Sequence, residues 1–138
     1  MNFNEQKIAI KSIESIISSN IGLIILDSAT SYYRYELNDE VSNINIRREL
    51  IKQINYLNIL TRKYNVASII TNQVFSNIDN NSIERLRALG GTAIEHISKT
   101  ILSFEKSGIG KRMIRIIKHR SIQEGNYCNF QITNNGLI

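Results

Sequence analysis

Two short stretches of this chain are largely apolar, and two longer stretches are apolar at helical spacing. Residues 21–26 and 66–71 have the composition of strands buried on both faces of a parallel sheet. Residues 2–19 and 43–64 carry apolar side chains every three or four positions, which predicts amphipathic helices. Because one helix joins the two apolar runs, we expect the runs to pair in parallel through a right-handed crossover.

The last third of the chain has a different pattern. Residues 99–105, 112–119 and 127–133 are predicted strands, since glycines at 108 and 110 mark a turn between the first two and Asn134-Asn135-Gly136 ends the third. A short helix over residues 92–97 precedes them. The whole pattern predicts one α/β domain over residues 1–138, in which parallel strands with covering helices are followed by an antiparallel β hairpin region.

Composition narrows the class of protein. The chain has 138 residues, 42% of them hydrophobic, with no apolar run long enough for a membrane span and no charged-then-apolar leader, so we expect a cytoplasmic protein. The single cysteine, Cys128, excludes an internal disulfide and has no partner at metal-binding spacing. The net charge of +5 arises in residues 99–138, and five basic side chains lie from Lys111 to Arg120 with no acid among them. Such a segment could meet phosphate, or its charges could simply keep an edge strand from aggregating.

Candidate chemistry lies where the two apolar runs end. Asp27 and Ser28 follow the first run, and Asn72 and Gln73 follow the second. The carboxyl ends of parallel strands share one edge of a sheet, where α/β proteins bind ligands. One carboxylate beside a hydroxyl suits a hydrated Mg²⁺ ion. The alternative is a core strand whose terminal Asp27 caps the next turn.

Two segments between these elements could bind a ligand. Residues 31–40 hold three tyrosines around Arg34, a set that could stack bases and reach phosphate or could pack beside the strand. Residues 74–89 are too long for an ordinary connection and carry Arg85 and Arg87.

These pieces form one ordered series that resembles the carboxyl half of a RecA-type recombinase core and, within that group, archaeal RadB, a paralogue of RadA. The resemblance covers nearly the whole chain and rests on the runs Asp27-Ser28-Ala29-Thr30 with Tyr33-Arg34, Ile70-Thr71-Asn72-Gln73-Val74, Leu89-Gly90-Gly91 with Glu95-His96, and Lys118-His119-Arg120-Ser121 with Glu124-Gly125.

The resemblance implies roles for particular residues. Asp27 falls at the Walker B aspartate that holds the Mg²⁺ shell of ATP, with Ser28 beside it, and Gln73 falls at the glutamine that senses the γ-phosphate. Lys118 and Arg120 fall where RecA places lysines that reach a neighbouring subunit's nucleotide. The family's two DNA-binding loops fall on residues 32–43 and 75–89, which implies DNA contacts at Tyr33, Arg34, Arg85, Arg87, Gly90 and Gly91.

The chain departs from the family pattern in three places. It has no Gly-x-x-x-x-Gly-Lys-Ser/Thr loop to bind phosphate and no upstream strand carrying the water-activating glutamate. Gln123 stands where the family usually has a proline. We therefore expect a RadB-like protein that begins partway through its ATPase core, from a truncated or split reading frame or a reduced form, and that hydrolyses no ATP alone. The chain also lacks the family's P-loop strand, so we expect an unfilled position in the sheet beside residues 66–71.

Two functions compete. The first is a DNA repair and recombination protein that binds DNA weakly, without sequence preference, and supplies half of a nucleotide site. The second is a non-enzymatic module that docks on RadA recombinase or a junction nuclease. An unrelated small-molecule enzyme is disfavoured, because His96 and His119 stand apart from any nucleophile.

Overall fold

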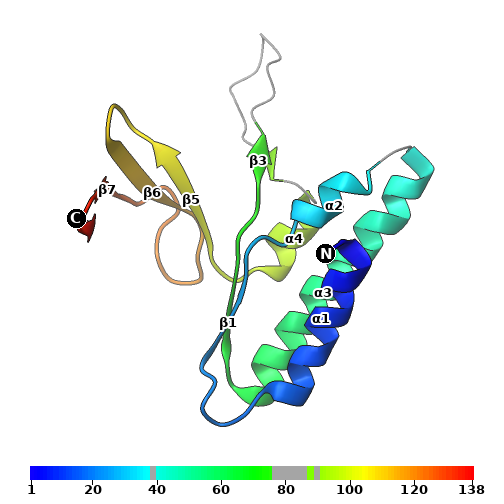
Figure 1. The fold of residues 1–138 in the computed structure, drawn as a ribbon. Helices are drawn as coiled ribbons and strands as arrows, with labels where there is room; N and C mark the ends of the chain where they lie inside the picture. The colour runs from blue at the N-terminus through cyan, green and yellow to red at the C-terminus, as the bar shows by residue number, and fades with distance from the viewer. Residues whose placement is uncertain (38–39, 76–86, 89–90) are drawn as a thin grey trace. The chain divides into compact units, whose positions relative to one another are not determined.

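The computed structural model describes residues 1–37, 40–75, 87–88 and 91–138 (Figure 1). The chain divides into two compact units, Met1–Ile97 and Ser98–Ile138, and each is described by itself. Among the described residues, no helix is both long enough and apolar enough to cross a membrane. Whether the chain folds as the single domain expected from its length stays a prediction.

A parallel pair of strands forms the centre of the first unit. Strand β1 (Leu23–Leu26) lies beside β2 (Ala67–Ile70), with Leu23 opposite Ala67 and Leu26 opposite Ile70. Helix α3 (Glu40–Tyr64), 25 residues long, connects them. The predicted parallel pairing is confirmed, and each strand is a little shorter than the apolar run that predicted it.

Helix α1 (Phe3–Ile16) lies alongside α3, and both helices cover the same face of the strands (Figure 1). It begins at Asn2, whose side chain accepts a hydrogen bond from the Glu5 N–H while the Glu5 carboxylate accepts one from the Asn2 N–H, both at 2.9 Å. This reciprocal pair satisfies two of the amide groups that a helix start leaves unpaired. The predicted cap is therefore present.

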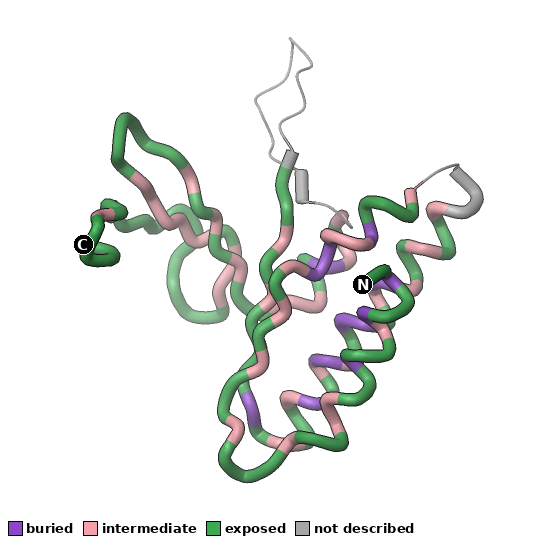
Figure 2. Tube along the Cα trace, viewed as in Figure 1, coloured by how far each residue is buried: buried purple, intermediate pink, exposed green. Residues whose placement is uncertain are grey.

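The core of the first unit lies between these two helices and the strands. Side chains of α3 at successive turns are buried, as the sequence predicts, and α1 adds its own apolar stripe (Figure 2). The most buried members are Leu50, Ile54, Leu57 and Leu60 from α3, and Phe3 and Ile10 from α1. Burial of each such side chain contributes about 1.5–3 kcal/mol relative to exposure.

A pair of buried amides interrupts this apolar interior. The Gln6 Nε2 donates to the Ala29 carbonyl at 3.2 Å and to Gln53 Oε1 at 3.0 Å. The two glutamines are 2% and 3% exposed. The remaining amide atoms, Gln6 Oε1 and Gln53 Nε2, have no hydrogen-bond partner within the described ranges.

The opposite face of the strands is open. Leu23, Ile25 and Ile69 are 45%, 63% and 52% exposed, and the register places Ile25 directly opposite Ile69. In the part of the chain that the structure describes, β1 and β2 pair only with each other. Parallel sheets are normally covered on both faces, so this apolar face is unusual in a folded unit.

Four short elements complete the first unit. Helix α4 (Thr92–Ile97) has the predicted bounds, and β3 (Val74–Phe75) pairs antiparallel with β4 (Arg87–Ala88). Residues 31–35, expected as part of a loop, form helix α2 (Ser31–Tyr35). Its Tyr33 ring packs edge-on against Phe3 with centroids 6.0 Å apart, a long-range contact that local sequence does not contain.

The second unit is an antiparallel sheet in the order β5 (Ile101–Lys106), β6 (Lys111–Lys118), β7 (Tyr127–Thr133) and β8 (Gly136–Leu137). The first three confirm the predicted strands within one or two residues. On one face Arg115 lies 3.4 Å from Glu105 and over the Tyr127 ring, and elsewhere Phe104 packs edge-on against Phe130. Strand β8 was not expected, because two residues are too few for an alternating pattern.

One carboxylate ties the carboxyl end of α1 to the end of α3. Glu14 accepts hydrogen bonds from Lys63 Nζ at 2.6 Å, from the Tyr56 hydroxyl and from the Tyr64 hydroxyl at 3.1 Å. These three donors, Lys63 first, lower the pKa of Glu14 from 4.5 to about 2. The charged form of Glu14 is therefore the form that holds the helices together.

We expect Glu14 to make unfolding pH-dependent. Because its folded pKa is about 2, its contribution is complete above pH 4.5 and is lost as the pH falls toward 2. Urea unfolding at several pH values should show this loss in the wild type and a smaller loss in Glu14→Gln. Glu36→Gln removes an exposed carboxylate and is the control, so its free energy of unfolding should depend on pH as that of the wild type does. The same pH dependence in all three proteins would contradict the prediction.

Gly91, just before α4, has a conformation and surroundings that suit only glycine. Its φ is +68°, and a Cβ built there would lie 2.7 Å from Nη2 of Arg47 on α3. The long Arg47 side chain can move, so the backbone conformation is the larger obstacle. The close approach brings a guanidinium of α3 to the start of α4.

Gly91→Ala should lower the free energy of unfolding by about 1–2 kcal/mol, the cost of a left-handed conformation in a residue with a Cβ. Chemical denaturation measures the change. Gly22→Ala is the matched control, since a Cβ there meets nothing within 4 Å, and it should change stability by less than about 0.5 kcal/mol. A similar loss in both variants would show that the Gly91 conformation is not the cause.

Candidate nucleotide and DNA site

Asp27 lies at the carboxyl end of β1 with an exposed side chain. Its Oδ1 accepts a hydrogen bond from the Thr71 hydroxyl just beyond β2, and the Ala29 N–H donates to the Thr71 carbonyl at 3.0 Å. The Asp27–Ser28 peptide bond is cis. One carboxylate oxygen is thus held by the neighbouring strand, while no hydrogen bond is seen to the other within the described residues.

Buried Thr30 ties the two strand ends together. Its hydroxyl donates to Asn72 Oδ1 at 2.8 Å and accepts the Gln73 N–H at 3.4 Å. Thr30 is 0% exposed, whereas the side chain of Gln73 is exposed at the same sheet edge. The structure therefore brings Asp27 and Gln73 to one edge, as expected from two adjacent parallel strands.

This edge fits a magnesium ion that keeps most of its water. Within the described ranges no group of three or more histidine, cysteine or acidic side chains gathers anywhere, so the protein offers no complete cage. Asp27 alone supplies charge, and the Ser28 hydroxyl beside it is hydrogen-bonded to Ser31 at 2.6 Å. Mg²⁺ commonly binds through one or two carboxylates, waters and phosphate oxygens, so the residues present suit the ion only when a phosphate accompanies it.

The aromatic segment after β1 divides between core and surface. Tyr33 is 5% exposed and belongs to the core cluster, and burial raises the pKa of its hydroxyl. Its ring face is packed and cannot stack a base in this conformation. Arg34 and Tyr35 are exposed on α2. For Tyr33, the structure therefore agrees with the alternative interpretation, in which the tyrosines pack beside the strand.

The structure describes the expected second DNA loop only at its ends. Arg87 lies in β4, where its backbone pairs with Phe75, and Arg85 and Gly90 fall outside the described residues. Gly91 is placed beside Arg47, a cation that sequence reasoning missed. Arg47 appears in the sequence only as a polar position of a helix, and nothing local signals that it approaches the start of α4.

Lys118 and Arg120 belong to the second unit, and the structure describes them within it. Lys118 ends β6, and Arg120 is exposed in the following turn. Between them, Nδ1 of His119 accepts the N–H groups of Ser121 and Ile122, both at 3.0 Å. His119 therefore shapes the turn that carries the two cations, which agrees with the structural role expected from its isolation in the sequence.

Comparison with known proteins agrees with this arrangement. The Rad51 family matches residues 2–138. The chain is 51% identical over 136 residues to the DNA repair and recombination protein RadB of Methanococcoides burtonii, and 40% identical over 136 residues to that of Archaeoglobus fulgidus. These matches cover 99% and 98% of this chain but 59% and 60% of the relatives, so the chain spans about three-fifths of their length.

A solved structure is similar as well. The crystal structure of the RadB recombinase superposes with a TM-score of 0.74 at 28% identity, covering 99% of this chain and 59% of that one. The resemblance inferred from the strand-end residues is thereby confirmed for family and fold. The chain belongs to the Rad51 family, and its parallel pair, covering helices and antiparallel sheet form part of a RecA-like core.

Proposed function

We propose that this chain is a RadB-like DNA repair and homologous recombination protein that binds DNA and supplies one half of a nucleotide site. The observation that carries the proposal is the pairing of Asp27 and Gln73 at one edge of the parallel strands, held by Thr71 and Thr30. The names of the relatives support the biological role. The lack of a Gly-x-x-x-x-Gly-Lys-Ser/Thr loop in these 138 residues supports the restriction to half a site. A cytoplasmic location is part of this proposal, since no apolar run of membrane-spanning length occurs in the sequence.

The nucleotide half-site of the first unit would use Asp27, Ser28 and Gln73. Lys118 and Arg120, in the second unit, would instead reach the nucleotide of a neighbouring subunit. Bound Mg²⁺ would neutralise charge on the phosphate oxygens of ATP. Asp27 orients the water shell of the ion through its carboxylate, and the Thr71 hydroxyl holds that carboxylate in place. Gln73 offers an amide that can donate to a phosphate oxygen and accept from a water.

The DNA contacts would be to phosphate, through Arg85, Arg87 and the basic segment of residues 111–120. Arg34 is exposed on α2, and Arg47 lies beside Gly91 at the end of the second loop. These two cations of the first unit could also contact DNA phosphates. Cations of this kind bind any sequence, because phosphate carries no base information. We therefore expect weak binding without sequence preference.

The DNA proposal can be tested by the salt dependence of binding to a single-stranded oligonucleotide. Arg85→Ala/Arg87→Ala should weaken binding and reduce the slope of log affinity against log salt by about 1.4, roughly 0.7 for each phosphate of a single strand that an arginine no longer neutralises. The matched control, Arg48→Ala/Arg62→Ala, removes two exposed charges from α3 and should leave the slope unchanged. An unchanged slope in the loop variant would rule out the second loop as a DNA contact.

The nucleotide proposal predicts no ATP turnover by the 138-residue chain alone, since no phosphate-binding loop is present in its sequence. Mixing it with the part of the Methanococcoides burtonii protein that it does not match should yield Mg²⁺-dependent turnover. Asp27→Asn should lower that turnover by about a hundredfold, and Glu36→Gln should not. Turnover by the chain alone that Asp27→Ala abolishes would contradict the half-site.

The open face of the parallel strands favours a second candidate, an interaction module. Exposed Leu23, Ile25 and Ile69 form an apolar face that a recombinase such as RadA or a junction nuclease could cover. A complex that forms without DNA and is abolished by Ile25→Ser would favour this function. Salt-sensitive DNA binding by the chain alone would favour the first.

A further inference from the structure

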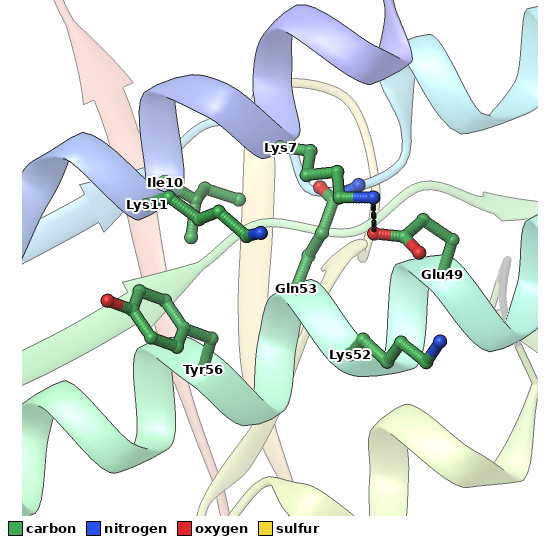
Figure 3. Close-up of a pocket in the computed structure, with 7 residues that line it drawn as sticks. All are labelled: Lys7, Ile10, Lys11, Glu49, Lys52, Gln53 and Tyr56. Carbon is green, nitrogen blue, oxygen red and sulfur yellow. Dashed lines mark ion pairs between the residues drawn. The ribbon is translucent and has the colours of Figure 1, made fainter.

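The outer side of the two long helices carries a hollow far in sequence from the strand-end residues. It has a volume of about 300 Å³ and lies between α1 and α3 (Figure 3). Its lining consists of Lys7, Ile10, Lys11, Glu49, Lys52, Gln53 and Tyr56. Three of these seven side chains are lysines and one is acidic, so the hollow is a basic groove.

Two ion pairs join α1 and α3 along the line of this groove. At one end Lys7 Nζ lies 2.9 Å from Glu49, and beyond the other end Lys63 Nζ lies 2.6 Å from Glu14. Lys11 and Lys52 also line the groove, and no ion pair to either is seen among the described residues. Figure 3 shows Lys11 reaching into the space between the helices, whereas Lys52 extends along α3 toward the Glu49 side. Within the described ranges, these two cations are thus left without an ion pair.

The inner part of the groove is apolar. Ile10 lies at the base of the groove, and the ring of Tyr56 borders the groove. The Tyr56 hydroxyl donates a hydrogen bond to Glu14, which holds this ring in place. Further apolar surface continues along the two helices at Ile8 and Ile59, which are 59% and 56% exposed. A small inorganic anion would satisfy the lysines but would leave this apolar surface in water.

Gln53 lines the groove but does not offer it a donor. The residue is 3% exposed, and its Nε2 is buried without a hydrogen-bond partner within the described ranges. The groove therefore combines two exposed cations with an apolar base.

We propose that this groove binds an acidic peptide segment of a partner protein, with one carboxylate on Lys11, another on Lys52 and a neighbouring apolar side chain over Ile10 and Tyr56. The charge of the groove selects glutamate or aspartate, and its volume accommodates a side chain of leucine or phenylalanine size. DNA fits less well, since its backbone offers charge without an apolar group for the base of the groove. The site is independent of the strand-end residues that carry the proposed function.

Fluorescence anisotropy of labelled synthetic peptides tests the proposal. A short peptide of alternating glutamate and leucine should bind the wild type, whereas peptides of alternating glutamine and leucine, or glutamate and serine, should bind about tenfold more weakly or worse. The first comparison removes the charge and the second removes the apolar group. Equal binding of the glutamate–serine peptide would reduce the groove to a nonspecific cation patch and overturn the proposal.

Variants locate the binding. Lys11→Glu/Lys52→Glu should weaken affinity for the glutamate–leucine peptide by about tenfold or more, because like charges then face each other. Arg48→Glu/Arg62→Glu makes the same change of charge on exposed positions of α3 outside the groove and should weaken it by about twofold or less. Thermal unfolding should give both variants midpoints near that of the wild type, since all four positions are exposed.

Three results would overturn the proposal. They are no binding of the glutamate–leucine peptide to the wild type, equal losses of affinity in the two charge variants, and displacement of the peptide by an oligonucleotide whose own affinity falls only in Lys11→Glu/Lys52→Glu. The last result would identify the groove as a DNA-binding surface. None of the three depends on ATP turnover, so failure here leaves the proposed function untouched.

Discussion

The first unit depends on the parallel pairing of β1 with β2. A parallel pair cannot be joined by a tight turn, so the chain must cross over, and α3 is that crossover. The same helix buries Leu50, Leu57 and Leu60 against the strands and α1. The pairing also sets where the strands end, and so places Asp27 next to Thr71. Fold and site thus follow from one connection.

A two-stranded parallel sheet covered on one face is an incomplete structure in physical terms. Its open face, with Ile25 opposite Ile69, exposes the kind of side chains that other α/β proteins bury beneath a second layer of helices. The relatives are longer than this chain, which spans about three-fifths of their length.

The fold could be predicted largely because its strongest signals are local. Short apolar runs indicated both central strands, helical spacing indicated α1 and α3, and turn residues between strand-like segments indicated three strands of the second sheet. Helix α2 escaped prediction, since its stability involves the packing of Tyr33 on Phe3, which is distant in sequence. Strand β8 escaped because it is two residues long.

The site was predictable only in part for a similar reason. Asp27 and Gln73 follow apolar runs, so the sequence places them at one edge. Arg47 beside Gly91, the three donors around Glu14 and the two hydrogen bonds to His119 arise from tertiary packing or from the shape of a turn. Residue order contains no sign of them, and the packing of α1 on α3 also creates the basic groove.

The buried amides of Gln6 and Gln53 give the helix pair a property that apolar packing alone could not. Leucine and isoleucine side chains tolerate a slide of one helix along another, because dispersion attraction is non-directional and each side chain finds a similar neighbour one turn further on. An amide hydrogen bond in an apolar interior has no such substitute, so a slide of one turn would strand Gln6 Nε2 from both Ala29 and Gln53. The hydrogen bonds of these two glutamines therefore favour one alignment of α1 with α3. In a unit whose strands are covered on only one side, that alignment determines which lysines lie across from each other on the two helices.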